Sequence, residues 1–432
     1  MTRFAGFTRL MSAAVLAGAV SGLGAIGFHY VADNLGEALY RATSTGDWLH
    51  RVPIVILVPT FGLMLVGVVL QLVPRSRIGG VREVVDSIQH DGGVVPIVRL
   101  LNVALSALTL GFGGSVGPEG PMVQLGAYIG SWVGQRFRLP RGGLQAIVRA
   151  GTAAGVAAAF RSPAGGVLLT LEVFGARFNR DLAAIGIAAA VGYLTRTVLL
   201  GDAYPFRPQV PIDPLPLPTL LVIVPIMGLV AAPTGHLFIR MFERFKTVFP
   251  AHWPLAARVA FGGFLVGCIG IWFPQVLSAG YPVIDHIIRD GMTVRLFVIL
   301  LFLKMLATST TLGSGAVGGL FAPTLLIGAL YGGAFGYGVH SLSPSLVPQP
   351  ELFVLLGMVV MFGSIVKGYW SGLLMVADLS GCYHQLLLPG VIAGGISYFA
   401  SWEILDRSIF GMSIDPAASA AREPVTVATG GA

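Results

Sequence analysis

One carboxylate stands alone in a long uncharged stretch of the sequence. Glu119 lies in the segment Gly-Pro-Glu-Gly-Pro, and no other charged residue occurs between Leu110 and Ile129. A glycine-rich break that opens a helix presents free backbone N–H groups at the positive end of the helix dipole, and this end attracts anions. We therefore predict that an ionised Glu119 takes the place of a bound anion, and that a protonated or displaced Glu119 frees that place. The alternative is a glutamate that caps a helix at its aqueous end.

A similar break occurs again, 202 positions later. Residues 110–130 and 312–332 align at this single offset, which pairs Gly117 with Gly319 and Pro121 with Pro323. Chance alignment of glycine-rich sequence is the alternative, but the paired prolines and the unbroken register argue against it. Neither break contains Lys or Arg, so backbone amides would hold the anion, weakly enough to release it. Duplicated broken helices indicate the binding site of a transporter.

The composition excludes a soluble enzyme and a disordered chain. Of 432 residues, 55% are hydrophobic and only 11% are charged, whereas a soluble domain is about 25% charged. Mean hydropathy is +0.80. The formal net charge is +7, but the sequence contains no run of basic residues. We therefore assign the excess of Lys and Arg to positive-inside loops and predict no nucleic-acid partner. The chain is expected to cross a lipid bilayer many times.

Patterns for catalysis and metal binding are missing from the sequence. Cys268 and Cys382 form no CxxC pair, and the eight histidines show no metal-ligand spacing. No HExxH motif occurs, and Glu119 has no nucleophile or base close to it in the sequence. We therefore predict no enzyme activity, no metal site and no cofactor.

Apolar blocks follow one another from residue 10 to residue 402. Several are shorter than the about 20 helical residues that a membrane span needs, which predicts half-helices that end beside a polar cavity. The Pro-rich stretch 203–218 cannot be helical. We expect an all-α polytopic membrane protein with a first repeat at 1–202, a linker at 203–218, a second repeat at 219–410 and a short polar tail at 411–432. The N-terminal apolar run is expected to be a retained helix rather than a cleaved signal peptide.

Four segments, in the right order, resemble the CLC family of chloride channels and exchangers. They are VGPEGPMVQLGA at 116–127, the AGTAAG stretch at 150–172, GAVGGLFAPTLLIGA at 315–329 and residues 358–381. The resemblance covers residues 10 to 405. It implies inverted repeats of tilted and broken helices, a pore in each subunit and a homodimer. It also implies a bacterial inner-membrane protein without cytosolic CBS domains.

The resemblance also implies an anion path past three groups of backbone amides, with a late side chain beside it. The implied anion-binding residues are Gly79, Gly80, Gly117, Gly120, Leu320, Phe321 and one of Tyr383 and His384, because the last segment aligns in two ways. The chain departs from the family at several of these places. Gly79 replaces a serine whose hydroxyl contacts the anion, Arg82 replaces a proline, and Pro118 replaces an arginine beside Glu119. The alternatives for Arg82 are a cation in a loop, which we favour, and a cation that faces the pore.

Val173 stands where proton-coupled members usually carry an inner glutamate, and valine cannot relay a proton. Glu172, the neighbouring acidic residue, is expected to be structural. The sequence therefore favours passive or weakly proton-coupled transport of chloride or another small monovalent anion, gated by Glu119. The alternative is a proton-coupled exchanger of chloride or fluoride, because some exchangers also lack the inner glutamate.

Overall fold

The computed structural model describes residues 2–44, 48–74, 80–176, 180–201, 205–208, 213–404 and 408–410. Within these ranges the chain is a bundle of α-helices, and its one β-type contact is an isolated bridge between two loops. The helices of the first half are α1 (Thr2–Ser44), α2 (Trp48–Leu72), α3 (Val81–Gln89), α4 (Arg99–Gly111), α5 (Glu119–Arg136), α6 (Arg141–Phe160), α7 (Pro163–Phe174) and α8 (Arg180–Leu200).

The second half repeats this order. Its helices are α9 (Val224–Val248), α10 (Leu255–Trp272), α11 (Tyr281–Asp290), α12 (Val294–Gly313), α13 (Phe321–Leu342), α14 (Glu351–Ile365), α15 (Tyr369–Ser380) and α16 (Tyr383–Ile404), with short η2 (Thr219–Ile223) before α9 and η3 (Pro274–Val276) before α11. The breaks coincide: α4 and α12 end 202 positions apart, and α5 and α13 begin 202 positions apart. The fold is the expected all-α inverted repeat of tilted and broken helices. The repeat boundaries at 202, 203, 218 and 219 stay predictions, and the tail at 411–432 lies outside the described residues.

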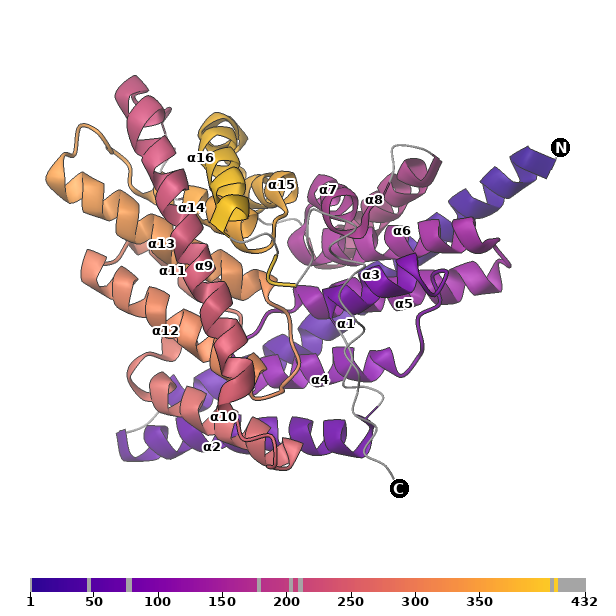
Figure 1. Cartoon of the computed structure of the whole chain (residues 1–432), viewed down its shortest axis with the longest axis horizontal. Coiled ribbons are helices and arrows are strands. Elements are labelled where there is room, and N and C mark those ends of the chain that lie inside the picture. The colour runs from indigo at the N-terminus through magenta and orange to yellow at the C-terminus, as the bar shows by residue number, and fades with distance from the viewer. Residues whose placement is uncertain are drawn as a thin grey trace.

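The two repeats lie against each other along their broken helices. Figure 1 shows α5 to α8 gathered on one side and α12 to α16 on the other, while α2 and α10 run side by side beneath them. Nine of the described helices are long and apolar enough to cross a membrane, and α4, α7 and α14 are shorter apolar helices. The chain is therefore an integral multi-pass membrane protein with part of its helices ending inside the bundle.

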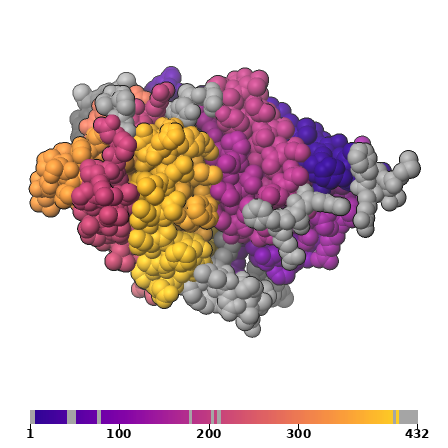
Figure 2. Space-filling model, turned by 90° about the horizontal axis from the view of Figure 1, so that it is seen from above, coloured from indigo at the N-terminus to yellow at the C-terminus, as the bar shows by residue number. Residues whose placement is uncertain are grey.

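Helix α14 shows how this fold buries short apolar helices. All of its residues from Leu352 to Ile365 are buried, as expected for a helix that is apolar on every face. By contrast, α16 forms a yellow band on the face seen in Figure 2, and it exposes Leu387, Leu388, Val391 and Phe399. Exposed apolar side chains of this kind suit contact with lipid or with another membrane subunit.

Glycines bring the paired helices close together. Gly126 on α5 faces Gly151 on α6, and Gly328 on α13 faces Gly357 on α14; a Cβ at any of the four would collide with the backbone of the partner helix. Small residues at such crossings let helices pack through van der Waals contact, which drives association where lipid replaces water. These two crossings fix the directions of α5 and α13, the helices that begin at the predicted site.

Candidate functional site

The two glycine-rich breaks meet at the centre of the molecule. The Gly117 amide donates to the Gly319 carbonyl at 2.8 Å, and the Gly319 amide donates to the Gly117 carbonyl at 2.8 Å. These residues are equivalent at the 202-residue offset, so the axis that relates the repeats passes between them. The Ser115 amide also donates to Thr311 Oγ1 at 3.1 Å. The broken segments of both repeats therefore form one joint structure.

Gly120 is required at this junction for steric reasons. A Cβ on Gly120 would lie 2.9 Å from Gly319 Cα and 3.6 Å from the Gly319 amide nitrogen. Because both atoms belong to backbone, neither can move aside as a side chain end would. Glycine here allows the first turn of α5 to approach the opposite loop closely.

Glu119 is fully buried directly behind this junction. Its Oε2 accepts a hydrogen bond from the Ala322 amide at 3.1 Å, in the first turn of α13. Its Oε1 accepts from the Tyr281 hydroxyl at the start of α11. The carboxylate of one repeat thus occupies a backbone donor at a helix N-terminus of the other repeat, which is where an anion would be attracted. The competition between Glu119 and an anion for this donor stays a prediction.

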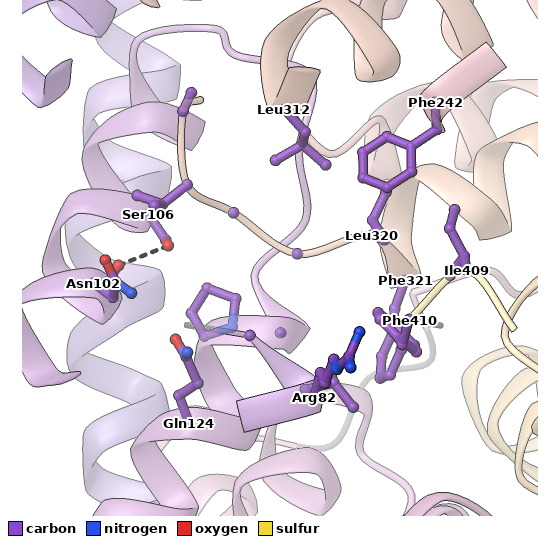
Figure 3. A pocket seen from close by; sticks show the side chains of 18 of the residues that line it. Arg82, Asn102, Ser106, Gln124, Phe242, Leu312, Leu320, Phe321, Ile409 and Phe410 are labelled. Carbon is purple, nitrogen blue, oxygen red and sulfur yellow. Dashed lines mark hydrogen bonds between the residues drawn. The ribbon is translucent and has the colours of Figure 1, made fainter. Parts of the chain in front are cut away.

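A cavity of about 540 Å³ opens on the other side of the two breaks. It is lined by the N-terminal ends of three helices, which supply Gly80 and Val81 of α3, Gly120 and Pro121 of α5, and Leu320 and Phe321 of α13. Figure 3 shows Asn102, Ser106 and Gln124 on one side of this view and Leu320, Phe321 and Phe410 on the other. The structure therefore brings Gly80, Gly120, Leu320 and Phe321 together. Gly117 lies at the junction behind them, and Gly79 falls outside the described residues.

Charged side chains give the cavity lining a net positive charge. Arg82 and Lys246 line it together with the single acidic residue Glu243, among the described residues. Gln124 is 5% exposed, and its Nε2 donor has no hydrogen-bond partner in the described part of the chain. The position of Arg82 on the cavity wall favours the alternative for this residue, a cation that faces the pore, and this stays a prediction. Arg82 is the second residue of α3, and its side chain is exposed.

An ion pair fixes α3 at the cavity. Glu83 on α3 pairs with Arg99 at the start of α4. Burial raises the pKa of Glu83 to about 7, and the Arg99 guanidinium opposes this rise. Gly80 begins α3 with a φ of 105°, a backbone angle that side chains with a Cβ rarely adopt. The ion pair and the Gly80 backbone angle fix the backbone at the N-terminus of α3, from which the side chain of Arg82 extends.

Tyr383 and His384 are not among the residues that line this cavity. Both are exposed at the start of α16, and the Tyr383 hydroxyl donates to Asp378. Their role in anion binding stays a prediction. The late aromatic residue of the cavity is instead Phe410, whose ring lies 5.6 Å from that of Phe321. The Ile409 amide donates to the Ile365 carbonyl at 3.0 Å and brings this segment to the cavity.

Phe410 lies beyond the last apolar block, where no motif marks it as a functional residue. The only signal was an aromatic residue soon after the end of that block. Phe410 has no hydroxyl, and neither has Gly79, which replaces the serine donor that the resemblance implies.

Val173 is buried in α7, and its neighbour Glu172 caps another helix. The Glu172 carboxylate accepts hydrogen bonds from the amides of Trp370 at 2.8 Å and Ser371 at 3.0 Å, at the start of α15. Carboxylates are stabilising at helix N-termini. This arrangement agrees with the structural role expected for Glu172.

The fold and the site define a class of membrane protein. Inverted repeats bring the N-termini of broken helices from both halves of the chain to one cavity, and the buried carboxylate of Glu119 lies behind the junction of the two breaks, as suits a transporter of small anions. A profile of the voltage-gated chloride channel family matches residues 61–401. The chain belongs to this family, the CLC family, and is an anion transport protein.

Individual relatives agree with this assignment. The chain is 30% identical over 351 residues to a "Putative chloride channel protein ClcB-like" of Ralstonia nicotianae. This alignment covers 78% of this chain and 80% of the relative. The chain is 31% identical over 293 residues to the "H(+)/Cl(-) exchange transporter ClcA" of Vibrio cholerae, covering 66% of this chain and 62% of the relative.

Two solved structures share the fold. A slow cyanobacterial Cl−/H+ antiporter superimposes with a TM-score of 0.83 at 22% identity, over 93% of this chain and 96% of that chain. A CLC-type fluoride/proton antiporter gives a TM-score of 0.78 at 23% identity, over 93% and 97% of the two chains. At these identities the comparison concerns the fold alone.

Removing the charge of Arg82 should slow anion transport most strongly at low salt. We expect Arg82→Gln to lower chloride flux about threefold at an ionic strength of about 0.01 M, because a cation in a cavity raises the local anion concentration. The loss should shrink at about 0.15 M, where screening acts within about 8 Å. Flux is measured at one chloride concentration with an impermeant salt added. Arg295→Gln, an exposed charge that does not line the cavity, is the control, and an equal loss in both variants would contradict the role of Arg82.

Proposed function

We propose that this chain exchanges chloride for protons across the bacterial inner membrane, with Glu119 as both the gate and the proton carrier. The observation that carries the proposal is the position of Glu119. The side chain is fully buried, and it accepts the Ala322 amide at the N-terminus of α13. An ionised Glu119 blocks this donor, whereas a protonated one can release it to an anion. Each opening then requires a proton on Glu119.

The comparisons support proton coupling more strongly than they support passive transport. One relative is named a proton/chloride exchanger, and the two structures with the same fold are described as proton antiporters. We therefore propose proton-coupled exchange rather than the passive or weakly coupled transport that the sequence favours.

Passive conduction is the second candidate because of one residue. Val173 is buried and cannot carry a proton, so protons would need another route to Glu119 from the inner side. If no such route exists, Glu119 exchanges protons with one side only, and anion movement is not tied to proton movement.

Flux into vesicles under opposed gradients separates the two candidates. The protein is reconstituted in liposomes with a chloride gradient and no proton gradient, and internal pH is recorded. Exchange predicts uphill proton movement that stops when chloride is replaced by an impermeant anion. Chloride flux without any proton movement would reject exchange and leave passive conduction. A parallel experiment with fluoride tests the fluoride alternative.

The proposal also includes a homodimer with one pore in each subunit. Residues 182–200 and 217–240 are strongly apolar, and on α8 and α9 they expose Leu194, Val198, Leu229 and Leu237. A second copy would cover part of this surface, and light scattering of the detergent-solubilised protein measures its mass. A monomeric mass would contradict the dimer.

A further inference from the structure

The N-terminus of α11 reaches the gate from the side opposite the cavity. Helices α3 and α11 are the short third helices of their repeats, and each begins after a glycine with positive φ, Gly80 at 105° and Gly280 at 89°. Because the repeats are inverted, the two helices approach the junction from opposite directions. The start of α3 lines the cavity, and the start of α11 places Tyr281 against Glu119.

Tyr281 and Ala322 together hold both oxygens of the Glu119 carboxylate. The Tyr281 hydroxyl donates to Oε1, and the Ala322 amide donates to Oε2 at 3.1 Å. Tyr281 does not line the cavity. It therefore contacts the gate without standing in the space that the structure offers to an anion.

The Tyr281 ring is fixed by its surroundings. It packs against Phe206 with ring centroids 5.7 Å apart, and Phe206 is buried. The Phe206 amide donates to the Leu379 carbonyl at 3.1 Å, which ties this support to the end of α15. The hydroxyl therefore points at Glu119 with little rotational freedom.

A buried lysine holds the segment that leads into α11. Lys304 on α12 is fully buried, and its Nζ donates to the carbonyls of Val276 at 3.0 Å and Ser278 at 2.7 Å. Ser278 in turn donates its amide to the Gly113 carbonyl at 3.3 Å and its hydroxyl to the Leu110 carbonyl at 3.0 Å. The segment before Tyr281 is thus attached both to α12 and to the chain that precedes Glu119.

We propose that Tyr281 is a latch: a positioning residue that holds the ionised Glu119 in its blocking place and so limits the rate of anion transport. This inference rests on the proposed gating function of Glu119. A hydrogen bond donated to a carboxylate is stronger than one donated to a neutral group, so Tyr281 stabilises the blocking state more than the open one. Because Lys304 and Phe206 fix Tyr281, Glu119 must break this bond when it leaves, and the tyrosine cannot follow it.

A double-mutant comparison tests the latch. Tyr281→Phe keeps the ring against Phe206 and removes only the donor, and we expect chloride flux to rise about tenfold, the effect of one hydrogen bond to a charged group. In the Glu119→Gln background the same substitution should change flux less than about twofold, because no carboxylate remains to be held. A residue that only supports the fold would change flux equally in both backgrounds.

Tyr331→Phe is the matched control, since it removes a buried hydroxyl that donates to the Met227 carbonyl at 2.6 Å, away from Glu119. It should leave flux unchanged. If Glu119→Gln raises flux but Tyr281→Phe does not, the latch is rejected and the gate stands. If Glu119→Gln has no effect on flux or on proton movement, the proposed function itself fails.

A second variant covers the case in which Tyr281→Phe does not fold. Phe206→Leu keeps the Tyr281 hydroxyl but loosens its ring, and it should raise flux by a smaller factor in the wild-type background only. An unchanged flux in this folded variant would overturn the proposal.

Discussion

Glu119→Gln is expected to abolish proton movement while keeping or raising anion flux. Glutamine has the size of glutamate, and its Oε1 can still accept from the Ala322 amide, so the fold should persist. It carries no charge and no exchangeable carboxyl proton. In vesicles, proton movement driven by a chloride gradient should fall to the level of protein-free vesicles.

The anion flux should change in the opposite direction because the competition at α13 weakens. Hydrogen bonds to a charged group contribute about 1.5–3 kcal/mol, and bonds between neutral groups about half as much. A loss of about 1.4 kcal/mol corresponds to a tenfold change in occupancy, so flux should rise by up to about tenfold. The dependence of flux on pH should flatten, because the group that titrates has been removed.

Glu351→Gln is a suitable control for this experiment. Glu351 begins α14 and accepts from Tyr337 at 3.4 Å, away from the cavity. It should leave both fluxes as they are. If Glu119→Gln stopped anion movement in a folded protein, Glu119 would be needed for the transport cycle itself or for structure, and the gating role would be wrong.

The repeat was accessible from the sequence because it depends on local patterns. Hydropathy marks the apolar helices, and glycine and proline mark where they break. The single offset pairs Gly117 with Gly319, and in the structure these two residues hydrogen-bond to each other. The alignment therefore pairs two residues that meet in the fold, since equivalent residues of a twofold repeat meet at its axis.

The remaining parts of the site depend on contacts between distant segments, which spacing does not reveal. Tyr281 lies 162 positions from Glu119, and nothing in its neighbourhood marks it as a partner of a carboxylate. The side chain of Arg82 is exposed and lines the cavity, but the sequence alone does not show which surface an exposed arginine faces. Phe410 follows the last apolar block, where no periodicity remains to indicate burial.

Adding one methyl group at Gly332 is expected to separate α13 from α14 and to cost more stability than most substitutions. A Cβ on Gly332 would lie 2.8 Å from the Phe353 carbonyl carbon and 2.9 Å from Gly357 Cα. These are backbone atoms, so relief requires moving a helix. Overpacking of this kind typically costs about 1–3 kcal/mol, and we expect Gly332→Ala to reach the upper end, because close packing holds helices together in lipid.

The matched control lies on the same helix. A Cβ on Gly338 would meet nothing within 4 Å, so Gly338→Ala should be neutral or stabilise the protein by up to about 1 kcal/mol through better helix propensity. Thermal unfolding in detergent compares the two variants, and flux is measured beside it. Gly332 lies about 17 Å along α13 from Phe321 at 1.5 Å per residue, so a displaced α13 would also move its N-terminus, which lines the cavity. Chloride flux through folded Gly332→Ala should therefore fall, while Gly338→Ala should keep it. Equal stability and equal flux in the two variants would show that the α13–α14 crossing does not set the position of the site.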